Sequence, residues 1–144
     1  WGILILFGGG LALAGILQGS QWFELMSIRL ENLGQLPQWV WLLIVAIIGV
    51  FATELLSNMA LVSALLPLLL SLSLAIGIPM DILSLPLVLG ASCAFMLPMA
   101  TPPNAIVFST GKLTITYMAY RGIVMNLLAI ALIVLLLQVV GITG

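Results

Sequence analysis

The chain has 144 residues, of which 64% are hydrophobic and 5% charged, with three basic residues, four acidic residues and no His. A water-soluble domain usually has about a quarter of its residues charged, so this composition excludes a soluble fold and predicts an all-α integral membrane protein. Three basic residues cannot form the phosphate-binding stripe of a nucleic-acid-binding protein.

The first region, residues 1–38, is predicted to hold a transmembrane helix followed by an interfacial helix. Residues 1–17 are apolar and close to the length of about 20 that one crossing needs. Residues 18–38 are more polar, with apolar side chains recurring at roughly helical spacing, which is typical of a helix lying at the membrane surface. Trp39 and Trp41 fit an aromatic belt where the next segment enters the membrane.

The second region, residues 39–78, consists of two apolar segments separated by a polar break at Ser57 and Asn58. We expect one helix to end near Leu56 and the next to begin near Asn58, with Ser57 or Asn58 in the capping position. The two segments either both cross the membrane or form a hairpin that returns. Free carbonyls at residues 53–56 would suit Na⁺, and free N–H groups at the start of the second helix would suit a carboxylate or sulfate.

Glu54 lies inside the apolar run just before this break. An acidic residue within a membrane segment is a functional candidate by default. The alternative is that Glu54 is wetted at the hairpin tip or binds backbone N–H groups there. The sequence leaves both interpretations open.

The third region, residues 79–111, is predicted to be a broken transmembrane helix. Asp81 follows a Gly-Ile-Pro turn and is expected to cap the helix that begins there. The break is the sequence Ala-Thr-Pro-Pro-Asn at 100–104. Adjacent prolines remove two backbone donors, and in hydrocarbon the freed carbonyls must find partners, so this break must face protein or a wet cavity.

Thr101 is expected to cap a helix that starts at Pro102, a residue favoured at the first helical position. Ala100 is among the residues whose carbonyls the prolines leave unpaired, and Asn104 is among those that offer free N–H groups. Two such breaks brought together would form a pocket of hydroxyls, amides and helix ends that needs no formal charge.

The last region, residues 112–144, is predicted to be a polar connection and a final transmembrane helix. The connection begins at Lys112 and ends near Arg121, and an uninterrupted apolar span follows. Two basic residues on this side against one, Arg29, on the other favour a cytoplasmic location for Lys112 and Arg121.

Three motifs carry a resemblance to a known family. They are Trp-Gly-Ile-Leu-Ile-Leu-Phe-Gly-Gly-Gly at 1–10, Thr-Glu-x-x-Ser-Asn at 53–58 and Ser-Cys-Ala-Phe-Met-Leu-Pro-Met-Ala-Thr-Pro-Pro-Asn-Ala-Ile-Val-Phe at 92–108. In order and spacing they resemble the C-terminal half of the divalent anion/sodium symporter family, the di- and tricarboxylate and sulfate transporters. The chain resembles about one of the family's two inverted repeats and looks like the C-terminal portion of a longer protein.

The resemblance implies a homodimeric bacterial inner-membrane transporter that moves a succinate-like dicarboxylate with Na⁺ by an elevator mechanism. It implies a re-entrant hairpin with the Ser-Asn motif at its tip and the Thr-Pro motif in the unwound middle of the next helix. The missing N-terminal repeat would supply a second half-site, so this chain alone should not transport. The implied substrate-binding residues are Ser57, Asn58, Met59, Thr101 and Pro102, and the implied Na⁺ ligands are Thr53, Leu56, Asn58 and Ala100.

Met59 departs from the pattern Ser-Asn-Thr that is frequent in the family. Position 59 is linked in the family to the choice of anion, and a thioether replaces a hydroxyl donor with a bulkier apolar group. We therefore expect weaker handling of one end of a dicarboxylate or a preference for another anion.

The alternatives within the superfamily are a Na⁺-independent dicarboxylate exchanger and a sulfate transporter. A membrane enzyme is disfavoured because acid–base catalysis needs a positioned titratable group, whereas this chain has no His and only scattered carboxylates. A purely structural membrane fragment remains a further alternative.

Overall fold

The computed structural model describes residues 36–141 continuously, together with residues 4–5, 8–9, 12 and 15–16. Residues 36–141 form helices without strands: α3 Gln38–Ala52, α4 Asn58–Ile76, α5 Met80–Ala91, α6 Pro102–Ser109 and α7 Ile115–Val139. The described residues between 4 and 16 are helical, as the first predicted helix requires. The predicted interfacial helix lies almost entirely outside the described residues.

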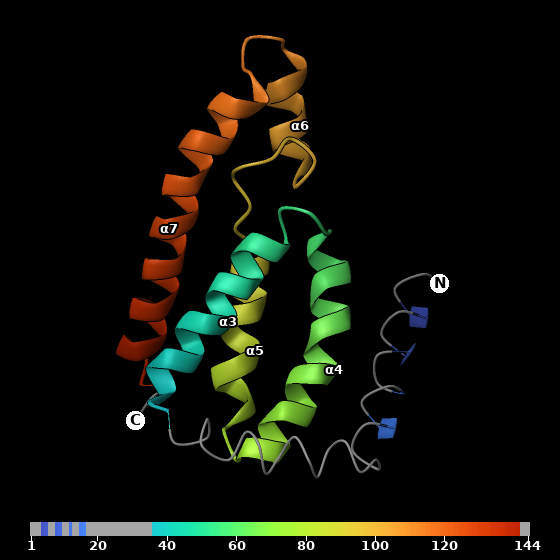
Figure 1. Ribbon diagram of the computed structural model, residues 1–144, viewed down its shortest axis with the longest axis vertical. Helices are drawn as coiled ribbons and strands as arrows, with labels where there is room; N and C mark the ends of the chain where they lie inside the picture. Colours follow the sequence, from blue (N-terminus) through green and yellow to red (C-terminus); the bar gives the residue numbers. More distant parts are fainter. Residues whose placement is uncertain (1–3, 6–7, 10–11, 13–14, 17–35, 142–144) are drawn as a thin grey trace.

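The helices form an elongated bundle in which α3 and α4 make an antiparallel hairpin (Figure 1). Its tip lies part of the way along α7 (Figure 1). α5 lies beside α3, and the chain then continues past the hairpin tip into α6 at the upper end (Figure 1). The hairpin tip and the segment between α5 and α6 are therefore neighbours in the middle of the molecule.

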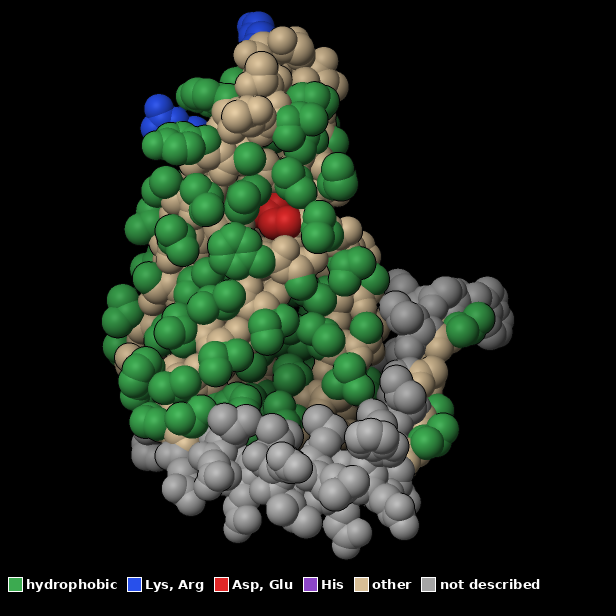
Figure 2. All heavy atoms as spheres, in the orientation of Figure 1, with side chains coloured by type: hydrophobic (Ala, Val, Ile, Leu, Met, Phe, Trp, Pro, Cys, Tyr) green, Lys and Arg blue, Asp and Glu red, His purple; other side chains and the backbone are tan. Residues whose placement is uncertain are grey.

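The apolar core is formed where α3, α5 and α7 meet. α3 contributes the largest share because its buried positions recur every three or four residues along one face. The buried side chains of this core include Leu42, Val45, Val50, Ile82, Leu83, Leu87, Ile130, Ile133 and Leu137. The outward surface is also mainly hydrophobic, with basic side chains at the upper end of the visible face (Figure 2), as expected for helices in a lipid environment.

Gly49 and Gly90 let α3 and α5 approach to backbone contact. A Cβ atom on Gly90 would lie 3.1 Å from the carbonyl oxygen of Ala46, and one on Gly49 would lie 3.0 Å from that of Leu87. This close approach extends to Ala91, the last residue of α5, whose backbone N would lie 3.3 Å from a Cβ atom on Gly49. It therefore brings the end of α5 against the hairpin tip.

Two described helices are long and apolar enough to cross a membrane, Asn58–Ile76 and Ile115–Val139. Their lengths of 19 and 25 residues agree with the roughly 20 residues of one span. α3, with 15 residues, is shorter than a full crossing. The prediction of an α-helical membrane protein is therefore confirmed.

Three predicted boundaries are wrong. α3 ends at Ala52 rather than near Leu56, because Thr53 and Glu54 are held by side-chain bonds to the chain after α5. Asp81 lies in the first turn of α5 and does not cap it; Pro79, which has no N–H to satisfy, holds the capping position.

The third wrong boundary is the connection before α7, which ends at Thr114 rather than near Arg121. The hydroxyl oxygen of Thr114 accepts a hydrogen bond from the N–H of Tyr117 at 3.3 Å, so this threonine caps the helix. Arg121 therefore lies within the helix, where its guanidinium sits 5.7 Å from the ring centre of Tyr117.

Candidate functional site: two broken-helix segments

Ser57 begins α4 at the hairpin tip. Its backbone is extended, and its hydroxyl oxygen accepts a hydrogen bond from the N–H of Ala60 at 3.3 Å. The predicted capping position is thus filled by Ser57, and Asn58 is the first helical residue. The N–H groups at the start of a helix carry partial positive charge.

The hydroxyl of Thr53 lies within hydrogen-bond distance of two further oxygen atoms beside the hairpin tip. Its Oγ1 lies 2.6 Å from Oδ1 of Asn58 and 2.9 Å from the carbonyl oxygen of Ala91, and the Thr53 side chain is 0% exposed. A hydroxyl has one proton to donate, so it can satisfy one of these two acceptors at a time. Three oxygen atoms, those of Thr53, Asn58 and Ala91, therefore share the single proton of the buried Thr53 hydroxyl.

Thr101 begins α6 as predicted. Its hydroxyl oxygen accepts from the N–H of Asn104 at 3.5 Å, and Pro102 occupies the first helical position. The irregular segment before it is longer than the Ala-Thr-Pro-Pro-Asn motif, since it covers residues 92–101 between α5 and α6.

Asn104 satisfies carbonyl groups that this irregular segment frees. Its side-chain amide donates to the carbonyl oxygen of Ala94 at 3.0 Å and to that of Leu97 at 3.1 Å. The Asn104 side chain therefore holds the irregular segment against the start of α6, which is the partner that a break within a membrane requires.

Glu54 joins the two breaks. Its carboxylate accepts hydrogen bonds from the N–H groups of three consecutive residues, Phe95, Met96 and Leu97, each at 2.9 Å. The side-chain amide of Asn126 on α7 donates to the same carboxylate at 2.8 Å. Of the two interpretations of Glu54 left open by the sequence, binding of backbone N–H groups is the one that the structure shows.

The sequence did not reveal the partners of Glu54, because they lie 41 to 72 positions away along the chain. One signal was available for Asn126, which is a polar side chain in the middle of the last apolar span. Such residues in membrane helices usually face the protein interior and have a partner.

The structure places the predicted substrate residues in two groups. Ser57, Asn58 and Met59 lie at the hairpin tip, and Thr101 and Pro102 lie at the start of α6. In the described part of the chain no hydrogen bond joins one group directly to the other; the links run through Glu54 and Thr53.

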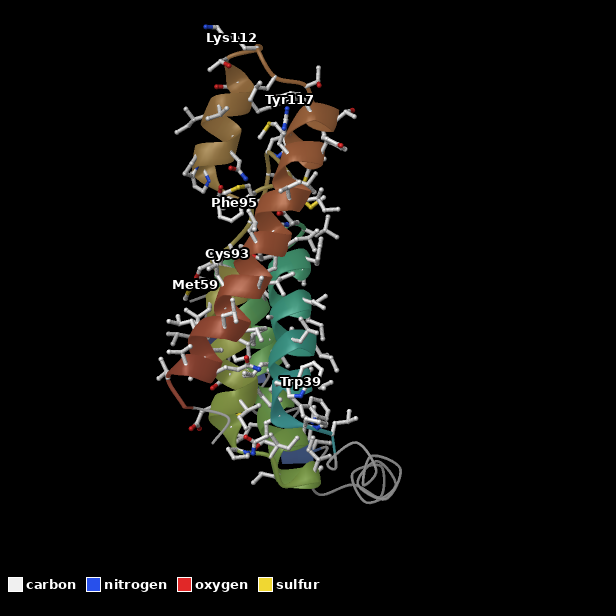
Figure 3. The ribbon with its side chains drawn as sticks, turned by 90° about the vertical axis from the view of Figure 1, so that its left-hand side faces the viewer. Trp39, Met59, Cys93, Phe95, Lys112 and Tyr117 are labelled. Atoms are coloured by element: carbon white, nitrogen blue, oxygen red, sulfur yellow. The ribbon has the colours of Figure 1, made fainter. Side chains whose placement is uncertain are left out.

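The two groups lie in the same region of the molecule. The N-terminal ends of α4 and α6 face each other across its middle (Figure 1), and Met59 and Phe95 lie on the same side of α7 (Figure 3). The Met59 side chain is 58% exposed. A ligand between the N-terminal ends of α4 and α6 would therefore contact two partially positive helix ends.

The predicted Na⁺ ligands are only partly brought together. Thr53 and Asn58 are in direct contact. Leu56 lies in the turn between them, and Ala100 lies at the end of the irregular segment, where its N–H donates to the carbonyl oxygen of Leu97 at 3.2 Å. Neither Leu56 nor Ala100 is hydrogen-bonded to Thr53 in the described residues. Ala91, which the sequence did not point to, supplies the third oxygen atom.

Comparison with known proteins identifies the family. A model of the sodium:sulfate symporter transmembrane region matches residues 1–143. The sodium-dependent dicarboxylate transporter SdcS of Staphylococcus saprophyticus is 44% identical over 135 residues, which are 94% of this chain and 26% of the relative. The transporter of the same name from Staphylococcus aureus is 40% identical over 140 residues, 97% of this chain and 27% of the relative.

The chain thus spans about a quarter of the length of these relatives. The resemblance noted in the sequence is confirmed, because the family model covers nearly every residue and the two relatives are 44% and 40% identical to the chain. The family consists of membrane transporters rather than enzymes, and the relatives depend on sodium by name. The chain belongs to the sodium:sulfate symporter family, the divalent anion/sodium symporters.

Proposed function

We propose that this chain forms the site-bearing part of a Na⁺-coupled transporter of dicarboxylates such as succinate. The proposal rests on the named activity of the relatives and on one structural observation, the oxygen atoms of Asn58 and Ala91 that share the single proton of the buried Thr53 hydroxyl. Na⁺ binds neutral oxygen atoms at helix ends. It can therefore occupy a position beside oxygen atoms that have no hydrogen-bond donor.

The Na⁺ site that we propose comprises Thr53, Leu56, Asn58 and Ala100. Thr53 and Asn58 already present oxygen atoms 2.6 Å apart. A cation beside them would satisfy the acceptor that the single proton leaves unpaired. The carbonyl groups of Leu56 and Ala100 would complete the ligand set after a small closing of the tip toward the irregular segment.

The anion site that we propose comprises Ser57, Asn58, Met59, Thr101 and Pro102. The helix ends at Ser57 and Thr101 are both capped by hydroxyl groups and face the same region (Figure 1). Helix dipoles favour a carboxylate or sulfate there. The N–H groups at the start of α4 add to this, whereas at the start of α6 Pro102 and Pro103 have no N–H and the N–H of Asn104, expected to be free, donates to the Thr101 hydroxyl. A carboxylate bound between the two ends would also attract Na⁺ to the adjacent oxygen atoms, which would couple the two ligands.

The larger architecture that we propose is an elevator-type homodimer in a bacterial inner membrane. α3 and α4 would form a re-entrant hairpin, because α3 is short for a crossing and the tip lies part-way along α7 (Figure 1). Lys112 and Arg121 would lie on the cytoplasmic side. The chain spans about a quarter of the relatives' length and would hold about one inverted repeat, so the rest of the protein would supply the second half-site.

The test is uptake of labelled succinate by the full-length protein in proteoliposomes, with Na⁺ outside or replaced by choline. Replacement by choline is expected to abolish uptake above that of empty vesicles. Uptake that is equal in choline would indicate a Na⁺-independent exchanger and contradict the proposed coupling.

Sulfate transport is the second candidate, and the description of the matching family favours it. The exposed thioether of Met59 at the hairpin tip cannot donate a hydrogen bond to a carboxylate. The Met59→Thr variant is therefore expected to bind succinate several-fold more tightly relative to sulfate in a competition version of the uptake assay. An unchanged ratio would show that position 59 does not select the anion.

A further inference from the structure

The carboxylate of Glu54 ties three separate elements together inside the molecule. Oε1 accepts from the N–H groups of Phe95 and Met96 and from the side-chain amide of Asn126, and Oε2 accepts from the N–H of Leu97. The Glu54 side chain is 4% exposed. The hairpin tip, the irregular segment and α7 are thus fixed to one another by a single side chain.

The partners of Glu54 are all hydrogen-bond donors, and both of its carboxyl oxygen atoms act as acceptors. All four hydrogen bonds are donated to the carboxylate, and charge-assisted bonds of this kind are about twice as strong as neutral ones. A glutamine at this position would offer one oxygen atom and would turn its NH₂ donors toward an N–H group. The four donors therefore match a carboxylate and do not match its amide analogue.

Two residues on the buried face of α7, Gly122 and Asn126, contact the irregular segment and Glu54. They lie one helical turn apart on this face. A Cβ atom at Gly122 would collide with the backbone of Phe95 and Met96, so only glycine lets the irregular segment lie flat on the helix. Asn126 is 0% exposed, and its Oδ1 has no hydrogen-bond partner among the described residues. An unpaired buried acceptor is costly, so this asparagine contributes through the amide that it donates to Glu54.

We propose that Glu54 is a positioning residue, whose carboxylate holds the hairpin tip and the start of α6 at a fixed position relative to each other. Glu54 lies next to Thr53 and three residues before Ser57, and its backbone partners lie shortly before Thr101. The two groups of site residues have no direct hydrogen bond between them in the described residues. Thr53 links the hairpin tip to the end of α5, and the Glu54 carboxylate is the link that reaches the segment just before Thr101. The inference rests on the proposed function, and it assigns to Glu54 no contact with Na⁺ or the anion.

The test compares Glu54→Gln with the wild-type full-length protein by amide hydrogen exchange and by transport. Peptides covering residues 93–101 are expected to exchange at least tenfold faster in the variant, while peptides from α5 stay unchanged. In proteoliposomes, KM for succinate and the Na⁺ concentration for half-maximal uptake are both expected to rise at least tenfold. Asp81→Asn makes the same acid-to-amide change at an exposed residue of α5 and is expected to alter neither readout.

Two further variants distinguish positioning from direct binding. Glu54→Asp keeps the charge on a shorter side chain and is expected to recover part of both losses, and it replaces Glu54→Gln as the test if the latter does not fold. Asn126→Leu removes one of the four donors and is expected to have a smaller effect, and its effect should be less than additive with that of Glu54→Gln.

The proposal is overturned if Glu54→Gln lowers transport without faster exchange at residues 93–101, because Glu54 would then act directly on a ligand. Faster exchange with unchanged KM and unchanged Na⁺ dependence overturns it as well. If the wild-type protein does not transport succinate, the proposed function fails, while the exchange experiment still decides whether the carboxylate holds the irregular segment.

Discussion

In the full-length protein, Asn58→Ala is expected to weaken apparent Na⁺ affinity by about 10- to 100-fold. The substitution removes the Oδ1 atom that lies 2.6 Å from Thr53 and leaves a fully buried hydroxyl with Ala91 as its remaining partner. The contact of a neutral oxygen atom with Na⁺ is taken to be as strong as a hydrogen bond to a charged group, about 1.5–3 kcal/mol, and each 1.4 kcal/mol is about tenfold in affinity.

The measurement for Asn58→Ala is succinate uptake as a function of Na⁺ concentration. Gln138→Ala serves as a matched control, because it removes an exposed side-chain amide near the C-terminal end of α7. This variant should leave the Na⁺ dependence of uptake unchanged. A wild-type Na⁺ curve in Asn58→Ala would remove Asn58 from the ion site.

Gly122→Ala is expected to lower the free energy of unfolding of the full-length protein by about 1–3 kcal/mol, the usual cost of overpacking. The added Cβ would lie 2.5 Å from the Cα atom of Met96 and would also meet the carbonyl group of Phe95. These are backbone atoms that cannot rotate away. Helix propensity alone would favour alanine over glycine by up to about 1 kcal/mol, so the contact and the propensity predict opposite signs.

Thermal unfolding of the detergent-solubilised protein measures this effect. Ala131→Leu adds a larger group to the exposed side of α7 and is expected to shift the melting temperature far less. A higher melting temperature in Gly122→Ala would mean that the irregular segment does not lie against α7 as described.

Local sequence chemistry predicted the parts of the site that depend on near neighbours. The caps at Ser57 and Thr101 follow from a hydroxyl next to the first helical residue, and each bonds an N–H three positions later. The turn before α5 likewise follows from Gly77, which takes a positive φ of 70°, a conformation that glycine adopts without steric cost.

The long-range contacts could not be predicted from the sequence alone. The end of α3 at Ala52 depends on bonds from Thr53 and Glu54 to residues about 40 positions later. No local pattern specifies that pairing. The role of Ala91 was also hidden, because any residue has a backbone carbonyl, and only the close packing of Gly49 on Gly90 brings this one to Thr53.

We propose that uncharged groups and helix ends from the two breaks bind the anion and Na⁺ together. A crystal structure of the full-length protein with Na⁺ and bromosuccinate tests this proposal, because bromine gives an anomalous signal that marks the anion. We expect a bromine peak between the start of α4 at Asn58 and the start of α6 at Pro102, which disappears when choline replaces Na⁺. A peak elsewhere, or one that persists at the same strength in choline, would contradict it.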